Sequence, residues 1–110
     1  MIIVNSITDR LNREAAQVIL RRGGGEFLVH LSVRDGCLKC GASETTPVML
    51  EVPENDSRFR ANGRDVVACA VGLCARCAGR GSNTAVQALR VEFSKRIGFV
   101  DCLGHSVKLR

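Results

Sequence analysis

Two pairs of cysteines, each with two residues between its members, constrain this chain more than any other feature. The pairs are Cys37 with Cys40 and Cys74 with Cys77. Two intervening residues allow a tight turn to aim both sulfur atoms at one ion. Four thiolates in a tetrahedron suit a structural Zn²⁺, which then has no open position for catalysis. The sequence therefore predicts one structural zinc site built from both pairs.

The cysteine content and the first residues favour a reducing compartment. The chain has six cysteines in 110 residues. The segment Met1–Arg10 begins with three apolar residues after Met1 and then turns polar, without the apolar stretch of a signal peptide. No apolar run approaches the length that spans a membrane. We therefore expect a cytoplasmic protein without membrane association, whose thiols serve metal or redox chemistry rather than disulfides.

Hydrophobic periodicity predicts a small α+β domain covering residues 1–110. We expect a short antiparallel sheet with one helix near each end of it. Only four phenylalanines supply aromatic bulk to its core, so the folding energy of a zinc site would compensate for the small core. The expected helices are Ile7–Arg22 and Thr84–Ile97, the expected strands are Glu26–Arg34, Pro47–Val52, Asp65–Val71, Phe99–Leu103 and Val107–Leu109, and Pro53–Arg64 is expected to be a loop.

The order of these parts resembles the treble-clef family of zinc modules, in which a knuckle and a hairpin precede a cysteine pair at a helix start. The residues that carry the resemblance are Cys37-Leu38-Lys39-Cys40-Gly41 and Leu73-Cys74-Ala75-Arg76-Cys77-Ala78, and it spans about Val33–Gly98. The family implies an architecture rather than one task, because its members bind DNA, RNA, proteins or ubiquitin, or are structural parts of enzymes. Small members also occur in phages and other mobile elements.

A second resemblance competes for two of the same cysteines. Cys69, Cys74 and Cys77 have the C-x4-C-x2-C spacing of plant-type [2Fe–2S] ferredoxins, and Cys102 follows after 24 residues. This resemblance implies one-electron transfer with those four cysteines as ligands. It leaves Cys37 and Cys40 without a role and places the cluster in the basic half of the chain, whereas such ferredoxins are usually acidic. Zinc is therefore the preferred metal, with [2Fe–2S] as the alternative.

Three further residues are alternative metal ligands. Cys102 and His105 form another pair at ligand spacing and, with Cys69, offer donors to a second ion. The competing interpretation is that Cys69, within an apolar run, belongs to the core and that His105 is a solvated side chain. The other histidine, His30, alternates with apolar residues and is expected to point outward from a strand.

The net charge of +5 is unevenly distributed, because residues 1–57 carry −2 and residues 58–110 carry +7. Thirteen arginines against three lysines favour bidentate contacts with phosphate or carboxylate groups. The alternative is a solvated basic face. The absence of Trp and Tyr disfavours base stacking on single strands. The candidate contacts to phosphate or to an acidic partner are Arg58, Arg60, Arg64, Arg76 and Arg80.

These features predict a non-enzymatic protein that binds another protein as an adaptor, regulator or inhibitor. Two histidines far apart in the sequence do not suggest a nuclease centre, and no catalytic triad or small-molecule site has a recognisable context. Four zinc-bound thiolates lower the net charge to about +3 and leave a dipolar chain, which suits a protein partner. The alternatives are a module that binds duplex DNA and an electron carrier.

Overall fold

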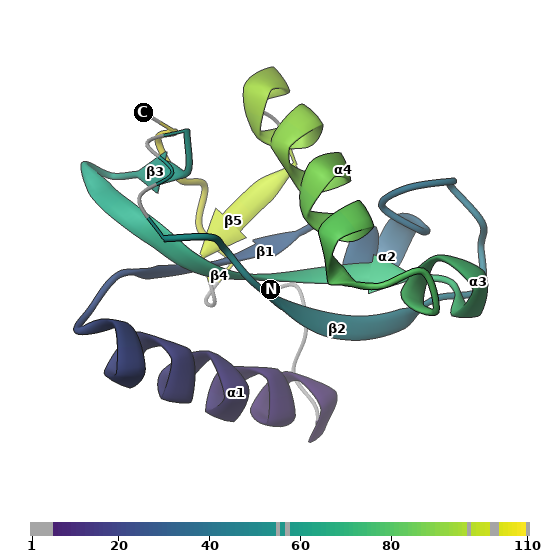
Figure 1. The fold of residues 1–110 in the computed structure, drawn as a ribbon, viewed down its shortest axis with the longest axis horizontal. Helices are drawn as coiled ribbons and strands as arrows, with labels where there is room; N and C mark the ends of the chain where they lie inside the picture. The colour runs from purple at the N-terminus through teal and green to yellow at the C-terminus, as the bar shows by residue number, and fades with distance from the viewer. Residues whose placement is uncertain (1–5, 55, 57, 97, 102–103, 110) are drawn as a thin grey trace.

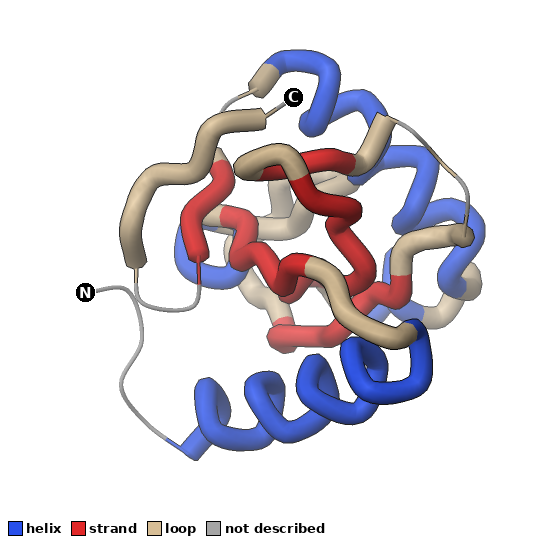
Figure 2. Tube along the Cα trace, turned by 90° about the vertical axis from the view of Figure 1, so that its left-hand side faces the viewer, coloured by secondary structure: helices blue, strands red, loops and turns tan. Residues whose placement is uncertain are grey.

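A mixed β-sheet lies between two long helices in the computed structural model, which describes residues 6–54, 56, 58–96, 98–101 and 104–109. Figures 1 and 2 show α1 below the sheet and α4 above it. This arrangement confirms the α+β class. The elements are α1 (Ser6–Arg22), β1 (Glu26–His30), α2 (Ser32–Asp35), β2 (Thr46–Glu51), β3 (Arg60–Ala61), β4 (Arg64–Leu73), α3 (Ala75–Ala78), α4 (Ser82–Lys95) and β5 (Phe99–Asp101).

Helix α1 covers one face of the sheet through a stripe of small and apolar side chains. Leu11, Ala15 and Val18 recur at helical spacing and are buried against the sheet. The helix ends at Arg22 because Gly23 adopts a φ of +78°. The N–H of Gly23 donates to the carbonyl of Leu20 and that of Gly24 to the carbonyl of Ile19, which is the Schellman pattern. The predicted first helix is therefore confirmed.

Strand β4 is the centre of the sheet, in which the strands follow the order β2-β4-β1-β5 and β3 also pairs with β4. Residues 66–73 of β4 are all buried because helices cover both faces of the sheet. β2 runs antiparallel to β4, but β1 runs parallel to it, with Val29 opposite Ala70. The expectation of a wholly antiparallel sheet was therefore wrong. The reason is that the chain between β1 and β4 carries α2, the first cysteine pair and β2, which is long enough for a parallel return.

The first predicted strand, Glu26–Arg34, is shorter than its alternating pattern suggested. β1 ends at His30, and Ser32–Asp35 forms the one-turn helix α2. His30 is buried at 8% exposure rather than pointing outward, because β5 and α4 close over it. Its ring lies 4.8 Å from that of Phe99, edge to face. The position of this side chain is decided by the packing of later parts of the chain. The alternation of polar and apolar residues in the sequence carries no information about that packing.

The main core fills the space between the sheet and α4. Leu28 from β1, Val71 from β4 and Leu89 from α4 are completely buried there. The aromatic rings of Phe93 and Phe99 approach to 4.9 Å. The predicted second helix is confirmed with different ends, since Gly81 takes the N-cap position, without a side-chain cap, and Arg96 the left-handed C-cap position.

The dimensions of the molecule agree with one compact body. The radius of gyration is 12.6 Å, close to the value of about 13 Å that a compact domain of this length adopts. No helix within the described residues combines the length and apolar character needed to cross a bilayer.

Candidate metal centre

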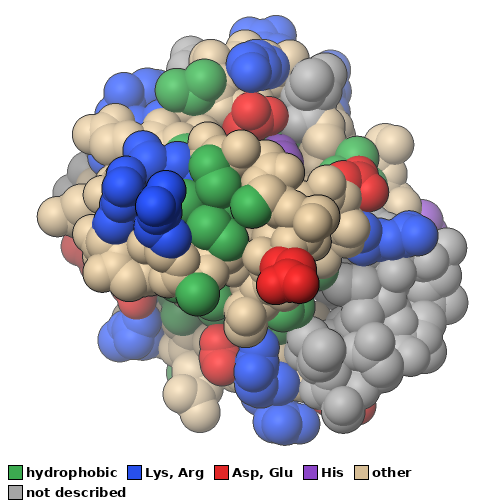
Figure 3. Space-filling model, turned by 90° about the vertical axis from the view of Figure 1, so that its right-hand side faces the viewer, with side chains coloured by type: hydrophobic (Ala, Val, Ile, Leu, Met, Phe, Trp, Pro, Cys, Tyr) green, Lys and Arg blue, Asp and Glu red, His purple; other side chains and the backbone are tan. Residues whose placement is uncertain are grey.

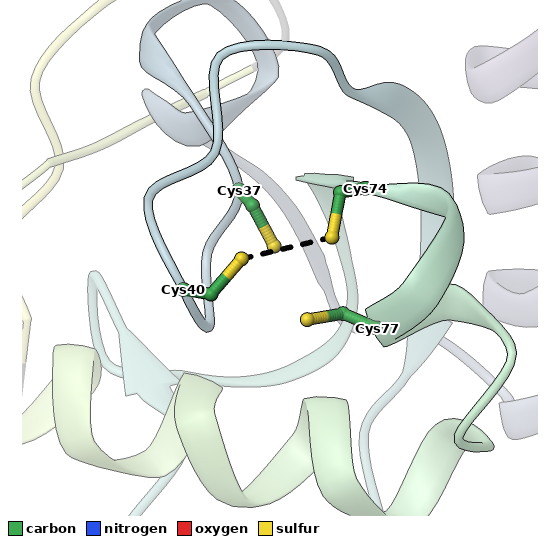
Figure 4. Close-up of side chains that lie close together, drawn as sticks. All are labelled: Cys37, Cys40, Cys74 and Cys77. Carbon is green, nitrogen blue, oxygen red and sulfur yellow. Dashed lines mark hydrogen bonds between the residues drawn. The ribbon is translucent and has the colours of Figure 1, made fainter.

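The four cysteines of the two pairs meet at one end of the sheet, although the pairs are far apart in the sequence. Their Sγ atoms all lie within 4.8 Å of one another. Figure 4 shows the four side chains pointing into a shared space, Cys37 and Cys40 from the loop after α2, Cys74 from the end of β4 and Cys77 from α3. One contact that joins the pairs is 3.6 Å, between the Sγ atoms of Cys40 and Cys74. The predicted clustering is therefore present.

A tight turn shapes the first pair. The N–H of Cys37 donates to the carbonyl of Ala42, and the N–H of Gly41 donates to the carbonyl of Cys37, both at 2.9 Å. Gly41 has a φ of +80°, which lets the chain reverse directly after Cys40. The N–H of Leu38 donates to the carbonyl of Gly72 on β4, also at 2.9 Å. The turn is thus anchored to the strand that leads into the second pair.

The second pair lies where β4 passes into a short helix. Cys74 is the N-cap residue of α3, with extended backbone angles, and Cys77 lies within the helix. The N–H of Ala78 donates to the carbonyl of Cys74 at 2.9 Å. This single turn places the two thiols on the same side, facing the first pair (Figure 4).

Burial divides the four thiols into two groups. Cys37 and Cys77 are 5% and 3% exposed and belong to the main core, whereas Cys40 is exposed and Cys74 is partly buried. The cluster is therefore a continuation of the core that opens to solvent on one side. A metal ion here would join the loop after α2 to the edge of the core.

The backbone around the cluster favours thiolate at two positions. Burial opposes ionisation of Cys37, but the N–H groups of Cys74, Cys40 and Lys39 outweigh it and lower the pKa of Cys37 to about 6. The N–H of Cys77 lowers the pKa of Cys74. Burial and the neighbouring thiols raise the pKa of Cys77 to about 12. Four thiols this close repel one another when ionised, and a bound divalent cation removes that conflict.

The donor set fits a metal that prefers four sulfur ligands. A tetrahedron with Zn–S bonds of about 2.3 Å has sulfur atoms about 3.8 Å apart. The Sγ atoms of Cys40 and Cys74 are 3.6 Å apart, and all four Sγ atoms lie within 4.8 Å of one another. These separations are close to that value. Four-cysteine sites also hold iron, so the geometry suits a thiolate-bound metal without choosing between the two.

Comparison of the chain with protein-family models, with curated proteins and with solved structures finds no match.

Two of the three alternative ligands, Cys69 and His105, do not join this cluster. Cys69 is completely buried in the middle of β4 and is part of the core, where burial raises the pKa of its thiol. His105 has a side chain that is 73% exposed and lies 3.5 Å from a carboxylate oxygen of Asp101, as expected for a solvated histidine. Cys102 lies outside the described residues. The described residues therefore do not assemble the plant-type ferredoxin ligand set.

Three of the five candidate arginines are paired with carboxylates. Arg58 makes two hydrogen bonds of 2.9 Å to Asp56, Arg60 lies 2.8 Å from Asp65, and Arg64 lies 3.4 Å from Glu26. These pairs offset the positive charge of this part of the surface. Each of these three arginines therefore has a carboxylate partner on the surface.

The other two candidate arginines lie beside the metal centre. Strand β4, ten residues long, separates Arg64 from α3 by about 30 Å. Arg76 and Arg80 are exposed, and within the described part of the chain no carboxylate pairs with either. Figure 3, which views the end of the molecule that carries α3, shows Lys and Arg side chains gathered beside a hydrophobic patch. The five arginines therefore do not form one surface.

Two residues that the sequence did not single out support the cysteine loops. Ser32 and Gly72 are both buried, and the N–H of Gly72 donates to the hydroxyl oxygen of Ser32 at 3.0 Å. One signal was available, because a single glycine within an apolar strand often marks a close approach of another backbone. No such signal marks Ser32, whose position depends on the packing of α2 against β4.

Proposed function

We propose that this protein binds one structural Zn²⁺ through Cys37, Cys40, Cys74 and Cys77. The observation that carries the proposal is the meeting of four thiols, and of no other ligand type, within 4.8 Å among the described residues. Bound zinc would supply folding energy to the loop and the core edge, and four protein ligands leave no position open for a substrate. A catalytic role for the metal is therefore not part of the proposal.

Zinc is preferred over iron because each pair lies on a local support of the kind that structural zinc sites use. The first pair is on a tight turn and the second is at a helix start. The test is elemental analysis and an absorbance spectrum of the purified chain. About one zinc per chain and no visible absorbance support the proposal, whereas iron with visible absorbance favours the electron carrier.

The arrangement supports a treble-clef-like module. A cysteine turn is followed by the antiparallel pair β2 and β4, and then by a helix-borne cysteine pair, which is the order expected of that family. The chain differs in carrying β3 and a further loop between β2 and β4, and in adding α1 and β1 before the first pair. We infer that the zinc module is built into a larger sheet rather than forming the whole domain.

We propose further that the protein is not an enzyme and acts by binding another protein in the cytoplasm. The closed ligand set offers no catalytic position. Carboxylates offset Arg58, Arg60 and Arg64, so a continuous phosphate-binding surface is not supported. The exposed basic residues Lys39, Arg76 and Arg80 belong to the loop after α2 and to the α3 segment. At this end of the molecule Lys and Arg side chains gather beside apolar ones (Figure 3), which suits an acidic protein surface.

Duplex nucleic acid is the second candidate partner, because Arg76 and Arg80 are without a carboxylate partner in the described part of the chain. Pull-down from native host lysate, with and without nuclease, separates the two. A partner retained after nuclease treatment supports protein binding. Duplex binding that weakens steeply between low and physiological salt supports the alternative. The double variant Arg76→Glu with Arg80→Glu should lose either partner, while the double variant Arg13→Glu with Arg21→Glu on α1 carries the same charge change elsewhere.

A further inference from the structure

Gly72 links the segments that carry the two cysteine pairs through hydrogen bonds of its N–H and carbonyl groups. The parallel pairing of β1 with β4 ends at Val29 and Ala70. Beyond that point, Ser32 and Leu38 occupy the edge of β4 in place of a strand. The hydroxyl oxygen of Ser32 accepts from the N–H of Gly72 at 3.0 Å, and the N–H of Leu38 donates to the carbonyl of Gly72 at 2.9 Å. Leu38 directly follows Cys37, and Gly72 precedes Cys74 by two residues, so these bonds set the separation of the pairs.

Ser32 is held in place from two directions. It is 6% exposed, and a β-carbon built on Gly72 would lie 2.2 Å from the Ser32 carbonyl oxygen. The backbones of α2 and β4 are thus in direct contact. The N–H of Ser32 belongs to the first turn of α2 and has no partner within the helix. It donates instead to Nδ1 of His30 at 2.9 Å.

His30 is a buried titratable group that the proposed zinc site does not itself use. Because Nδ1 accepts the Ser32 bond, the neutral ring carries its proton on Nε2. Nε2 is buried without a hydrogen-bond partner in the described part of the chain and lies 3.5 Å from a carboxylate oxygen of Glu92. A proton added to Nδ1 would remove the acceptor of the Ser32 N–H. The neutral ring is therefore the form compatible with this arrangement.

The surroundings of His30 favour the neutral ring on balance. Burial lowers the pKa of His30 below the ordinary 6.5. The negative charges of Glu92 on α4 and Asp35 on α2 act in the other direction and raise it, but burial is the larger effect. From β5 the ring meets Phe99, and the adjoining Gly98 leaves space for it, since a β-carbon there would lie 3.2 Å from Nε2. From β4 the neighbouring titratable group is Cys69, whose pKa burial raises, so its thiol is neutral. The charges that favour the protonated ring are those of Glu92 and Asp35.

We propose that His30 and Ser32 are positioning residues for the four-cysteine metal site, and that the site holds its metal fully only while His30 is neutral. Protonation at Nδ1 displaces the backbone of Ser32, which weakens its bond to Gly72 and releases the anchor of the Cys37 turn. This inference rests on the proposed metal site. The contribution of neutral His30 to metal retention is complete above pH 6.5, the ordinary pKa of histidine. It is lost as the pH falls through the lower pKa that His30 has in the folded protein.

The test is zinc release from the zinc-loaded full chain between pH 4.5 and 7.5, followed with a chromogenic chelator. In His30→Asn the amide oxygen takes the place of Nδ1 as an acceptor but does not titrate in this range. We expect release from this variant to begin at lower pH and to be less steep than in the wild type. Ser32→Ala removes the acceptor for Gly72 and should bind zinc about tenfold more weakly or worse at pH 7.5, with the pH dependence retained.

His105→Asn and Ser43→Ala are the matched controls, because both residues are exposed and both variants should behave as wild type. A wild-type chain that binds no metal overturns the proposed function itself. A wild-type chain that binds zinc, with His30→Asn releasing it at the same pH, overturns the role of His30. If His30→Asn fails to fold, as judged by circular dichroism, the zinc affinity of Ser32→Ala is the deciding measurement. Wild-type zinc affinity in that variant overturns the positioning role.

Discussion

The Sγ atoms of Cys40 and Cys74 lie 3.6 Å apart although 34 positions separate the two residues in the sequence. The antiparallel pairing of β2 with β4 produces this contact, because it returns the chain to the end of the sheet from which the cysteine loop departs. A metal at this position would close a long loop of the chain. Long closures of this kind restrict the unfolded state most.

We predict that each of the four clustered cysteines is required for metal binding and that Cys69 is not. Replacing Cys37, Cys40, Cys74 or Cys77 with serine removes one of four sulfur donors, so bound zinc should fall from about one per chain to near zero. Cys69→Ala keeps a small apolar side chain in the core and should retain the metal. Metal content after gel filtration measures this. Loss of zinc from Cys69→Ala alone would show that the site had been assigned to the wrong cysteine.

Removal of the metal should destabilise the whole domain. The cluster is continuous with the main core through Cys37 and Cys77, so the folded state binds the ion and the unfolded chain does not hold it in one place. At free zinc one hundred times the dissociation constant, the linkage is about 2.7 kcal/mol, or roughly 10–20 °C in Tm. Thermal melts with and without a chelator measure this shift, and re-addition of zinc should reverse it. An unchanged Tm contradicts a structural role.

Gly72→Ala should weaken both the fold and metal binding. The added β-carbon would lie 2.2 Å from the carbonyl oxygen of Ser32, which is backbone and cannot rotate away. Overpacking of this kind costs about 1–3 kcal/mol in the free energy of unfolding. Gly79→Ala is the matched control, since its β-carbon would meet its nearest neighbour at 3.4 Å and its φ is −71°. Urea unfolding of both variants measures the difference, and equal midpoints would count against the close approach of α2 to β4.

Asp56 should stabilise the loop after β2 through its arginine partners. Its carboxylate accepts from the side chains of Arg58 and Arg90, and its side chain is 10% exposed. Asp56→Asn should cost about 1–3 kcal/mol in the free energy of unfolding. Asp65→Asn, whose side chain is 70% exposed beside Arg60, should cost at most about 1 kcal/mol. Denaturant unfolding at pH 7 measures both values, and equal effects would contradict the special role of Asp56.

The same carboxylate predicts a pH dependence. Hydrogen bonds from Arg58, assisted by Arg90 and opposed by burial, lower the pKa of Asp56 to about 2 from its ordinary 3.8. A carboxyl with a lowered pKa in the folded state contributes stability that is complete above 3.8 and is lost as the pH falls through about 2. The stability of Asp56→Asn should therefore change less than that of the wild type between pH 5 and pH 2. Parallel curves for the two proteins would show that Asp56 does not titrate this way.

The two long helices and the metal ligands could be predicted because their signals are local. The stripe of Leu11, Ala15 and Val18 and the glycines after Arg22 define α1, and the spacing of the two pairs points to one tetrahedral site. The parallel pairing of β1 with β4 had no such signal. Both orientations bury an apolar strand equally well, and only the return path of the chain distinguishes them.

The sequence by itself determined the four sulfur ligands and the amphipathic helices, since residue spacing and periodicity are properties of neighbouring residues. Only the tertiary structure decided the burial of His30, the pairing of Arg90 with Asp56, and the bonds of Gly72 to Ser32 and Leu38. The physical reason is that burial, charge compensation and the partners of backbone groups depend on which distant segments pack together. The candidate zinc site depends on both the local sequence and the tertiary structure. Local spacing selects its ligands, and the return of β4 brings them together.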